Sequence, residues 1–478
     1  DWVVRAFNDN LPYDQFLTQQ LAGDLLPNAA RNQQLATAFN RIHRLNNEGG
    51  AIFEEWRLEN VADRVHTFGT AMLGLTLECS RCHDHKYDPI SQRDYYALSA
   101  FFNSIDENGL YDRTEKVPSP TMLLPSAEQS AALEQARAAI LAAEHECANL
   151  VMDQPVEQIG DLLIHLDFNT ALDKQIAHPS KDDRNAVPDI GATALEAGNK
   201  AVVLDGDVGV TLKSIEPFDR WAPFTVDIRC IENQRVPQRA VIAHNPRRTD
   251  GGYNGWDLTI ENGHVESRLY RVWPGNGIGV RTVRAIPAQK WQHLTVTYDG
   301  SSRAEGLKLY LDGELLETTI LRDEIIKSAN VLVDHGGQFV LGQRFRDRGF
   351  AHAHVDDLRI YSRDLSNDEV RHLCGQKVKL FAYSDKARAK RERLKQARHA
   401  FVMAEDAMNE IPVMKETAMP RETHVLARGQ YDAPTTDATR VTRATFASIG
   451  PAFPKDAPLD RRGLARWVTL PENPLTSR

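Results

Sequence analysis

The chain has 478 residues, 42% of them hydrophobic, which predicts several domains that each bury a core. Its 57 basic and 66 acidic residues give a net charge of −9, and this balance argues against nucleic acid as a partner. The apolar runs are too short for a transmembrane segment. Because the chain opens on DWVVRAFNDNLPYDQF, with no initiating Met and no export signal, we expect a fragment of a longer precursor.

Residues 1–125 show helical periodicity and predict a mostly α domain. Within it, residues 39–50, FNRIHRLNNEGG, are polar and end in two glycines, which predicts a loop. A longer helical pattern follows and runs directly into ECSRCHDHKYDPIS, residues 78–91. Its apolar stripe consists of Trp56, Val61, Val65, Phe68, Met72 and Leu75.

Residues 126–155 and 380–411 each carry one apolar stripe, with alternating spacings of three and four residues. A helix with a single apolar stripe is not stable alone in water, so we expect the two segments to pack as an antiparallel helical hairpin. This pairing makes residues 160–375 an inserted module. The two stripes consist of Leu133, Ala136, Ile140, Ala143, Cys147 and Leu150, and of Leu394, Ala397, Phe401, Ala404, Met408 and Ile411.

The insert contains many short strand candidates separated by Gly, Asn and Asp, among them FTVDIRC, WDLTIENG and HLTVTYDG. This rhythm predicts an all-β jelly-roll sandwich, and the Asp-Gly pair in YLDGEL predicts a hairpin turn. Residues 412–478 are rich in turns and contain one short helix pattern, RRGLARWV. We expect them to be the truncated start of a further domain.

The insert carries a set of motifs in a typical order. Trp291 and His293 precede TYDG at 297–300, KLYLDG follows at 308–313, and VDDLRIYSRDLSNDEV spans 355–370. In these motifs the insert resembles the laminin-G-like, concanavalin-A-like sandwich family. The resemblance implies a jelly roll that binds glycans or proteins.

Calcium is a further expectation that this resemblance raises. Family members with calcium use loop carboxylates and carbonyls, and Asp205, Asp207 and Asp356 are the candidates in this chain. The alternative is that these residues form turns, which is the commoner role of Asp between strands.

The flanking segments resemble a second group. The stretch from FNRIHRLNNEGG to SQRDYYALSAFF is similar to a cytochrome-c-type domain of unknown function that is abundant in planctomycetes and their relatives. The tail, RETHVLARGQYDAP and RRGLARWVTLPENPLTSR, is similar to its companion C-terminal domain. Chains of this family commonly place a laminin-G-like module between the two parts. The family has no settled activity, and its pattern continues beyond NPLTSR, so a site completed downstream would be missing.

Cys79, Cys82 and His83 form a Cys-x-x-Cys-His motif. Covalent haem c needs two thiols that add across the vinyl groups and an imidazole that reaches the iron, and this motif supplies all three within five residues. The resemblance strengthens this interpretation. It implies that Cys79 and Cys82 are the thioether anchors and that His83 is the proximal ligand.

The second axial ligand of such a haem is open. His43, in the polar loop, is the first choice. His85 is too close in sequence to His83 to reach the opposite haem face easily. Met72 and His66 lie on the preceding helix, where ordinary helix roles are expected. Charged residues near the motif, such as Arg41 and Glu48, could line a pocket beside the haem or could form salt bridges between helices.

Two other interpretations of the motif remain. Zinc could be held by Cys79, Cys82, either His83 or His85, and one distant histidine, although no second Cys-x-x-Cys pair is present. The two thiols could also form a disulfide, as redox enzymes do at this spacing. The remaining cysteines stand alone in apolar patterns and are expected to pack as small buried hydrophobes. They are Cys147, Cys230 and Cys374.

Three functions compete. The first is an exported c-type haem protein at the periplasm or cell surface, which passes electrons to a partner or supports an oxidative step on a glycan held by the sandwich. The second is a non-redox surface protein that binds a polysaccharide or another protein. The third is a metal-dependent hydrolase using His43, His83 and His85 with nearby acids.

Overall fold

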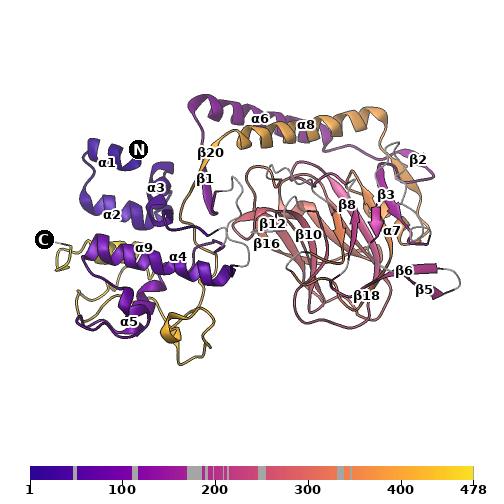
Figure 1. The fold of residues 1–478 in the computed structure, drawn as a ribbon. Helices are drawn as coiled ribbons and strands as arrows, with labels where there is room; N and C mark the ends of the chain where they lie inside the picture. Colours follow the sequence, from indigo (N-terminus) through magenta and orange to yellow (C-terminus); the bar gives the residue numbers. More distant parts are fainter. Residues whose placement is uncertain are drawn as a thin grey trace. The chain divides into compact units, whose positions relative to one another are not determined.

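Contacts divide the chain into two compact units, shown with the whole chain in Figure 1. Unit 1 consists of Asp1–Leu124 and Glu410–Arg478, and unit 2 consists of Pro125–Asn409. Among the described residues, no helix is both long and apolar enough to cross a membrane. The computed structural model describes the chain except for residues 47–50, 110–116, 170–185, 189–191, 197–198, 208, 213–214, 246–253, 331–338, 345–346 and 477–478.

Unit 1 is mostly helical, as predicted for the N-terminal region. Its α-helices are α1 (Trp2–Asn8), α2 (Tyr13–Ala22), α3 (Arg31–Ala36), α4 (Phe53–Phe68), α5 (Gln92–Ser99) and α9 (Arg461–Val468). Short turns are η1 (Gly23–Leu25), η2 (Thr37–Arg41), the π-helical η3 (Gly69–Leu73), η4 (Glu78–Arg81) and η6 (Ala427–Gly429). Two small sheets pair β1 (Thr121–Leu124) with β20 (Asn409–Pro412) and β21 (Thr423–His424) with β22 (Arg440–Val441).

The C-terminal tail completes the core of unit 1. Helix α9 packs against α2, and its buried Leu464 and Trp467 join the same apolar cluster as Leu21 of α2. Arg461 of α9 is fully buried and pairs with Asp24 at 2.6 Å. The expectation that residues 412–478 begin a further domain is wrong, because apolar side chains along the whole tail, such as Met414 and Phe446, join the core of the N-terminal helices.

Unit 2 is built on a large β-sandwich, which confirms the predicted all-β module. One sheet, called the β10 sheet, has the strand order β16-β12-β11-β10-β9-β17-β7-β4. The other, called the β8 sheet, has the order β15-β14-β13-β8-β18-β6-β5, and β3 also pairs with β18. The strands of the β10 sheet are β4 (Ala186–Pro188), β7 (Val210–Leu212), β9 (Ala240–Asn245), β10 (Gly255–Glu261), β11 (His264–Val272), β12 (Asn276–Thr282), β16 (Thr318–Glu324) and β17 (Phe339–Leu341). Those of the β8 sheet are β3 (Leu162–Leu166), β5 (Ala192–Glu196), β6 (Asn199–Leu204), β8 (Phe224–Glu232), β13 (Gln292–Tyr298), β14 (Leu307–Leu311), β15 (Glu314–Leu315) and β18 (Ala353–Tyr361).

Side-chain alternation sets which face of each strand is buried in the core. On β10, Trp256 and Leu258 belong to the core cluster, whereas Asp257, between them, lies on the outer face. Between the sheets, Phe224 of β8 packs edge-on against Trp256, with ring centroids 5.7 Å apart. Two short elements flank the sandwich: α7 (Asn367–Leu373), and the pair of β2 (Gln154–Val156) with β19 (Leu380–Ala382). The 3-10 turn η5 (Ala304–Gly306) precedes β14.

Helices α6 (Ala127–Cys147) and α8 (Asp385–Asp406) lie side by side in Figure 1. They are antiparallel, because Gln129 Nε2 donates to the Ala407 carbonyl at 3.0 Å while Arg393 pairs with Glu146 at 2.6 Å. The side chains of the two predicted apolar stripes within these helices are half-buried.

Helix α8 also has a second face, which binds the sandwich through polar groups. Its buried Glu405 pairs with Arg220 and accepts a hydrogen bond from the Lys327 amide at 3.0 Å. The hairpin and the sandwich therefore belong to the same compact unit. The apolar pattern alone does not indicate this contact, because the residues that make it are charged.

Candidate functional site

The cysteine motif lies on the 3-10 turn η4 and the two residues that follow it, Cys82 and His83. A 3-10 helix has three residues per turn, so side chains three apart lie on one face. Cys79 and Cys82 accordingly share a face, and both are exposed free thiols. Cys82 Sγ lies 3.3 Å from the Arg428 carbonyl oxygen. Glu78 and Arg81 share the neighbouring face of the turn.

The two histidines after the turn differ in their free nitrogens. His83 is exposed, and its Nδ1 lies 2.7 Å from the Asp84 carbonyl, which can only accept, so Nδ1 carries the proton and Nε2 keeps its lone pair. His85 Nδ1 accepts from the Asp88 amide at 2.9 Å, which places the proton of the neutral ring on Nε2. His83 is thus the histidine that presents a ligating nitrogen beside the thiols.

His43 lies in a buried charge cluster, which we call the Glu107 cluster. His43 Nε2 accepts from Arg64 at 3.0 Å, and Nδ1 donates to the Arg44 carbonyl at 3.0 Å. Arg64 also donates to both Glu107 oxygens, at 2.5 and 2.6 Å, and Arg41 lies 3.7 Å from the same carboxylate. Burial, followed by the Arg64 charge, lowers the pKa of His43 to about 4.

These bonds limit what His43 can do. It is neutral near pH 7, and a role as an axial or metal ligand would require one ring nitrogen to give up its present partner. Arg41 Nη2 donates to the carbonyl of Ser119 at 2.9 Å, so its guanidinium is engaged as well. Glu48, the other residue expected beside the motif, lies outside the described residues.

A concave region of about 710 Å³ adjoins the cysteine turn. His66 sits at its wall, with Nε2 3.2 Å from the Tyr95 hydroxyl and Nδ1 3.7 Å from Glu78. An ion pair to Arg81 holds the pKa of Glu59 below its usual range. The other expected helix residue, Met72, is buried in η3. The lining residues are Arg44, Glu59, Ala62, Asp63, His66, Thr67, Thr70, Ala71, Glu78 and Arg81.

Haem c can be tested against this geometry. Two exposed thiols on one face and a neighbouring imidazole with a free Nε2 fit covalent attachment and axial ligation. The concave region beside the turn is lined mainly by polar and charged residues, so it does not supply an apolar surface against which the haem ring could pack. The attachment chemistry therefore fits haem c, whereas the surroundings mainly supply polar contacts.

Two of the three carboxylates expected for calcium, those of Asp205 and Asp356, have partners within the protein. Asp205 Oδ1 accepts from the Asp207 amide at 2.9 Å, which is a turn contact. Asp356 forms an ion pair with Arg229. Within the described part of the chain, no group of three or more His, Cys, Asp or Glu side chains is arranged to hold a metal ion.

The three solitary cysteines differ in burial. Cys230 is buried, as expected, whereas Cys147 and Cys374 are half-buried. Burial raises the pKa of both Cys230 and Cys374 to about 12, so neither is a thiolate near pH 7.

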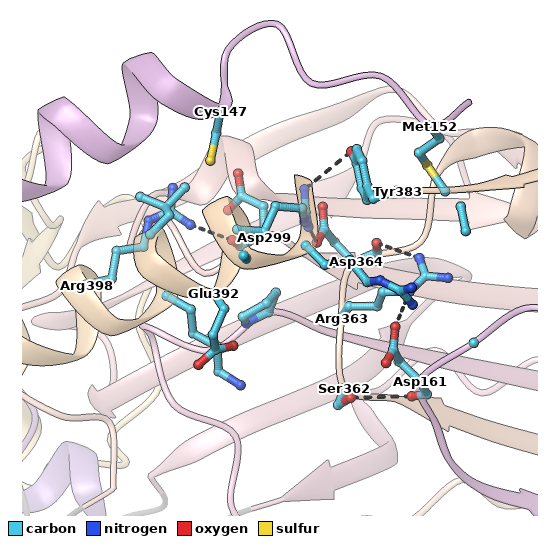
Figure 2. A pocket seen from close by; sticks show the side chains of 18 residues that line it. Cys147, Met152, Asp161, Asp299, Ser362, Arg363, Asp364, Tyr383, Glu392 and Arg398 are labelled. Carbon is cyan, nitrogen blue, oxygen red and sulfur yellow. Dashed lines mark hydrogen bonds and ion pairs between the residues drawn. The ribbon is translucent and has the colours of Figure 1, made fainter. Parts of the chain in front are cut away.

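Unit 2 contains a cavity of about 620 Å³ between α8 and the sandwich, which we call the α8 cavity (Figure 2). It lies where β3 and β8 begin and β13 and β18 end. These strands pair antiparallel, so the loops before β3 and β8 and those after β13 and β18 lie at the same end of the β8 sheet. The lining residues are Cys147, Met152, Gly160, Asp161, Pro223, Asp299, Ser362, Arg363, Asp364, Ala382, Tyr383, Arg388, Ala389, Arg391, Glu392, Leu394, Lys395 and Arg398.

The walls of the α8 cavity combine an aromatic ring with oriented charged groups. The Arg391 guanidinium lies 4.9 Å from the Tyr383 ring centre and pairs with Asp364. Arg363 pairs with Asp161 at 3.0 Å. Burial raises the pKa of Asp364. Planar groups held in this way can donate to and accept from neighbouring hydroxyls of a ligand.

The α8 cavity does not follow from the predicted apolar stripe of residues 380–411, because the residues that line the cavity from this segment are mostly the basic ones between the stripe positions. The run KARAKRERLKQAR, residues 386–398, was the available indication, because it places several cations on faces that the stripe leaves free.

Two separate segments of the chain match models of known protein families. Residues 1–107 match the family described as "Protein of unknown function (DUF1549)", and residues 205–371 match the concanavalin A-like lectin/glucanases superfamily. No curated protein sequence matches the chain.

The chain also matches several solved binding domains at low similarity. The binding domain of Paraclostridial Mosquitocidal Protein 1 is 18% identical and has a TM-score of 0.33, with 45% of this chain and 52% of that chain covered. The receptor binding domain of botulinum neurotoxin D is 15% identical (TM-score 0.32; 45% and 52%). The ligand binding domain of botulinum neurotoxin serotype D, solved with N-acetylneuraminic acid, is 17% identical (TM-score 0.32; 45% and 50%). The chain thus spans about half the length of these structures, and likeness at this level says nothing about function.

The chain therefore joins a helical region similar to a family of unknown function to a jelly-roll sandwich similar to the concanavalin A-like lectins and glucanases.

Proposed function

We propose that unit 2 is a carbohydrate-binding module and that the sugar binds in the α8 cavity. The observation that carries the proposal is the Tyr383 ring in the cavity wall, next to the oriented pair of Arg391 and Asp364. A sugar ring presents an apolar C–H face, which an aromatic ring can cover, and hydroxyls at its edge, which fixed guanidinium and carboxylate groups can bind. The superfamily match of the sandwich supports the same class of ligand.

The outer face of the β10 sheet is a weaker location for this function. Asp257, at its centre, is fully buried and accepts from Arg268 at 2.7 Å, Arg344 at 2.8 Å and the Tyr270 hydroxyl at 2.8 Å. Its hydrogen-bonding capacity is used within the protein. The α8 cavity, in contrast, has polar groups along a solvent-accessible wall.

A glycan array followed by calorimetry on the bound sugar tests the proposal. Tyr383→Ala should weaken binding about tenfold, because it removes the surface that covers the sugar ring. Tyr87→Ala is a matched control, since Tyr87 is an exposed tyrosine in unit 1. Wild-type protein that binds no glycan, or a Tyr383→Ala variant with unchanged affinity, would contradict the proposal. Binding to a protein and to no glycan would support protein binding, which the resemblance of the sandwich also implies.

A second candidate is covalent haem at the cysteine turn. It is favoured by the two free, exposed thiols on one face and by the free Nε2 of His83. Cys79 and Cys82 would hold the group through thioethers, His83 would ligate the iron, and the Asp84 carbonyl would fix the His83 ring. Bound haem would supply one-electron exchange with a partner protein. Attachment of this kind takes place outside the cytoplasm, so the parent protein would be periplasmic or at the cell surface.

Expression with a c-type maturation system tests this candidate. Cys79→Ala and Cys82→Ala should each weaken covalent retention of haem after denaturation, and Cys374→Ala should leave it unchanged. His83→Ala should keep the covalent link and change the spin state in the visible spectrum. Protein that carries zinc and no haem would favour the metal-dependent alternative, with His43 or His85 as a further ligand.

A further inference from the structure

The shape of the α8 cavity carries information about the length of its ligand. Its lining on α8 extends from Arg388 to Arg398. A helix rises about 1.5 Å per residue, so this wall is about 15 Å long, several times the length of one sugar ring. Figure 2 shows Tyr383 and Arg398 toward opposite ends of the cavity, with Asp299 and Asp364 between them. The cavity is therefore elongated along α8.

Hydrogen-bond donors are spaced regularly along this wall. Arg391, Lys395 and Arg398 line the cavity at positions i, i+4 and i+7, which lie on one face of a helix. Arg391 is oriented by Asp364, and Arg398 is oriented by the Asp299 carbonyl at 2.7 Å. Among the described residues, no carboxylate lies within ion-pair distance of Lys395, so its ammonium can turn toward a ligand.

Aromatic rings accompany this row at both ends. Tyr383 lies beside Arg391 at one end. Trp221 lies beside the other end, with Lys395 Nζ 5.7 Å from its ring centre and the His399 ring centroid 4.4 Å away. Pro223, two residues after Trp221, lines the cavity. The same combination of a ring and a cation thus occurs twice along α8.

We infer that the α8 cavity binds a linear oligosaccharide of several units, laid along α8, with Tyr383 and Trp221 contacting different sugar rings. A row of similar donors at regular spacing suits a polymer whose hydroxyls repeat, whereas a single sugar would contact only one end of the row. The inference rests on the proposed function, and it adds the size of the ligand and a second contact surface that lies outside the immediate cavity wall.

Calorimetry with linear oligomers of glucose, xylose and N-acetylglucosamine, each from one to six units, tests the inference. Affinity for the series that binds should rise by about tenfold or more between one and three units and then level off. Trp221→Ala should remove this rise while leaving the affinity for the shortest bound oligomer within about twofold of wild type. Trp221→Phe should restore most of the rise, because the ring is kept.

A further variant and its control test the row of donors, and the pattern of results separates this inference from the proposed function. Lys395→Ala should reduce the rise, and Lys386→Ala should not, since Lys386 is an exposed lysine of α8 that does not line the cavity. Binding that depends on Tyr383 but not on oligomer length or on Trp221 would overturn the inference and leave the proposed function standing. Failure of all three series to bind would also overturn it, and failure on the glycan array as well would overturn both.

Discussion

The Glu107 cluster of unit 1 and the α8 cavity of unit 2 use the same residue types with opposite results. In the Glu107 cluster, the side chains of Arg41, His43, Arg64 and Glu107 are at most 1% exposed, and they bond to one another and to backbone carbonyls. In the α8 cavity, arginines and carboxylates also pair, but the wall stays open to solvent and includes Lys395. Burial, rather than the number of charges, separates a cluster that holds the fold from one that can reach a ligand.

Glu107→Gln should have the largest effect, and it tests whether the Glu107 cluster holds unit 1 together. The substitution leaves the Arg41 and Arg64 guanidinium groups buried without a counter-charge, which costs about 3–5 kcal/mol of the free energy of unfolding. Hydrogen–deuterium exchange at α4 peptides, in a urea series, measures this loss in unit 1.

Glu422→Gln is the control for that measurement. Glu422 pairs with Arg440 in the same unit, but its side chain is 60% exposed. Its loss should cost less than about 0.5 kcal/mol. Equal effects of the two substitutions would remove the distinction by burial on which the comparison rests.

Acidification should expose the second property of the Glu107 cluster. The pKa of His43 is lowered to about 4, from an ordinary value of 6.5, so below pH 6.5 the unfolded chain binds a proton that the folded chain does not. Stability therefore falls as the pH drops, by about 2 kcal/mol between pH 7 and pH 5 from this residue. In His43→Gln that part of the pH dependence should disappear. His66, whose pKa burial also lowers, contributes a remainder in both proteins.

The comparison also shows what sequence patterns could predict. The two-residue alternation of strands such as FTVDIRC predicted the sandwich, because each strand has one face in the core. The spacing of the cysteine motif predicted two thiols and a histidine close together in the chain, and the structure places Cys79 on the turn η4 with Cys82 at its C-terminal end. What this motif binds stays a prediction. Local periodicity and short spacings report on local geometry, which is why these predictions were possible.

The Glu107 cluster and the α8 cavity could not be predicted in the same way. Glu107 meets Arg64 across 43 residues, and Arg391 meets Asp364 through packing of a helix on a loop. The sequence does not distinguish a buried charged residue from a solvated one, so no periodicity identifies these partners. The tail was misplaced for a related reason: only the tertiary contact of α9 with α2 shows that it belongs to unit 1.

Glu405→Gln tests the attachment of α8 to the sandwich, on which the shape of the α8 cavity depends. Glu405 is buried, but its replacement keeps an amide oxygen that can still accept from the Lys327 amide and Arg220. We expect a loss of about 1.5 kcal/mol in unit 2, smaller than for Glu107 because only one guanidinium loses its counter-charge. Thermal unfolding monitors the loss, and glycan affinity should fall with it if the hairpin forms the cavity wall. Unchanged stability would mean that the apolar contacts of α8 alone hold it in place.

Glu59→Gln should have the smallest effect, because its pair is intermediate between the two extremes. The Glu59 and Arg81 side chains are 31% and 21% exposed, and solvent already screens their attraction. The expected loss is about 1 kcal/mol or less.

Arg81 lies on η4 between the two cysteines, so weakening its pair should loosen this turn more than the rest of unit 1. Exchange of the Cys82 amide, which donates to the Cys79 carbonyl at 3.1 Å, should therefore speed up relative to amides of α5. A stability loss as large as that of Glu107→Gln, with no local change in exchange, would show that partial exposure does not weaken an ion pair in this protein, and the contrast between the closed cluster and the open cavity would then need another cause.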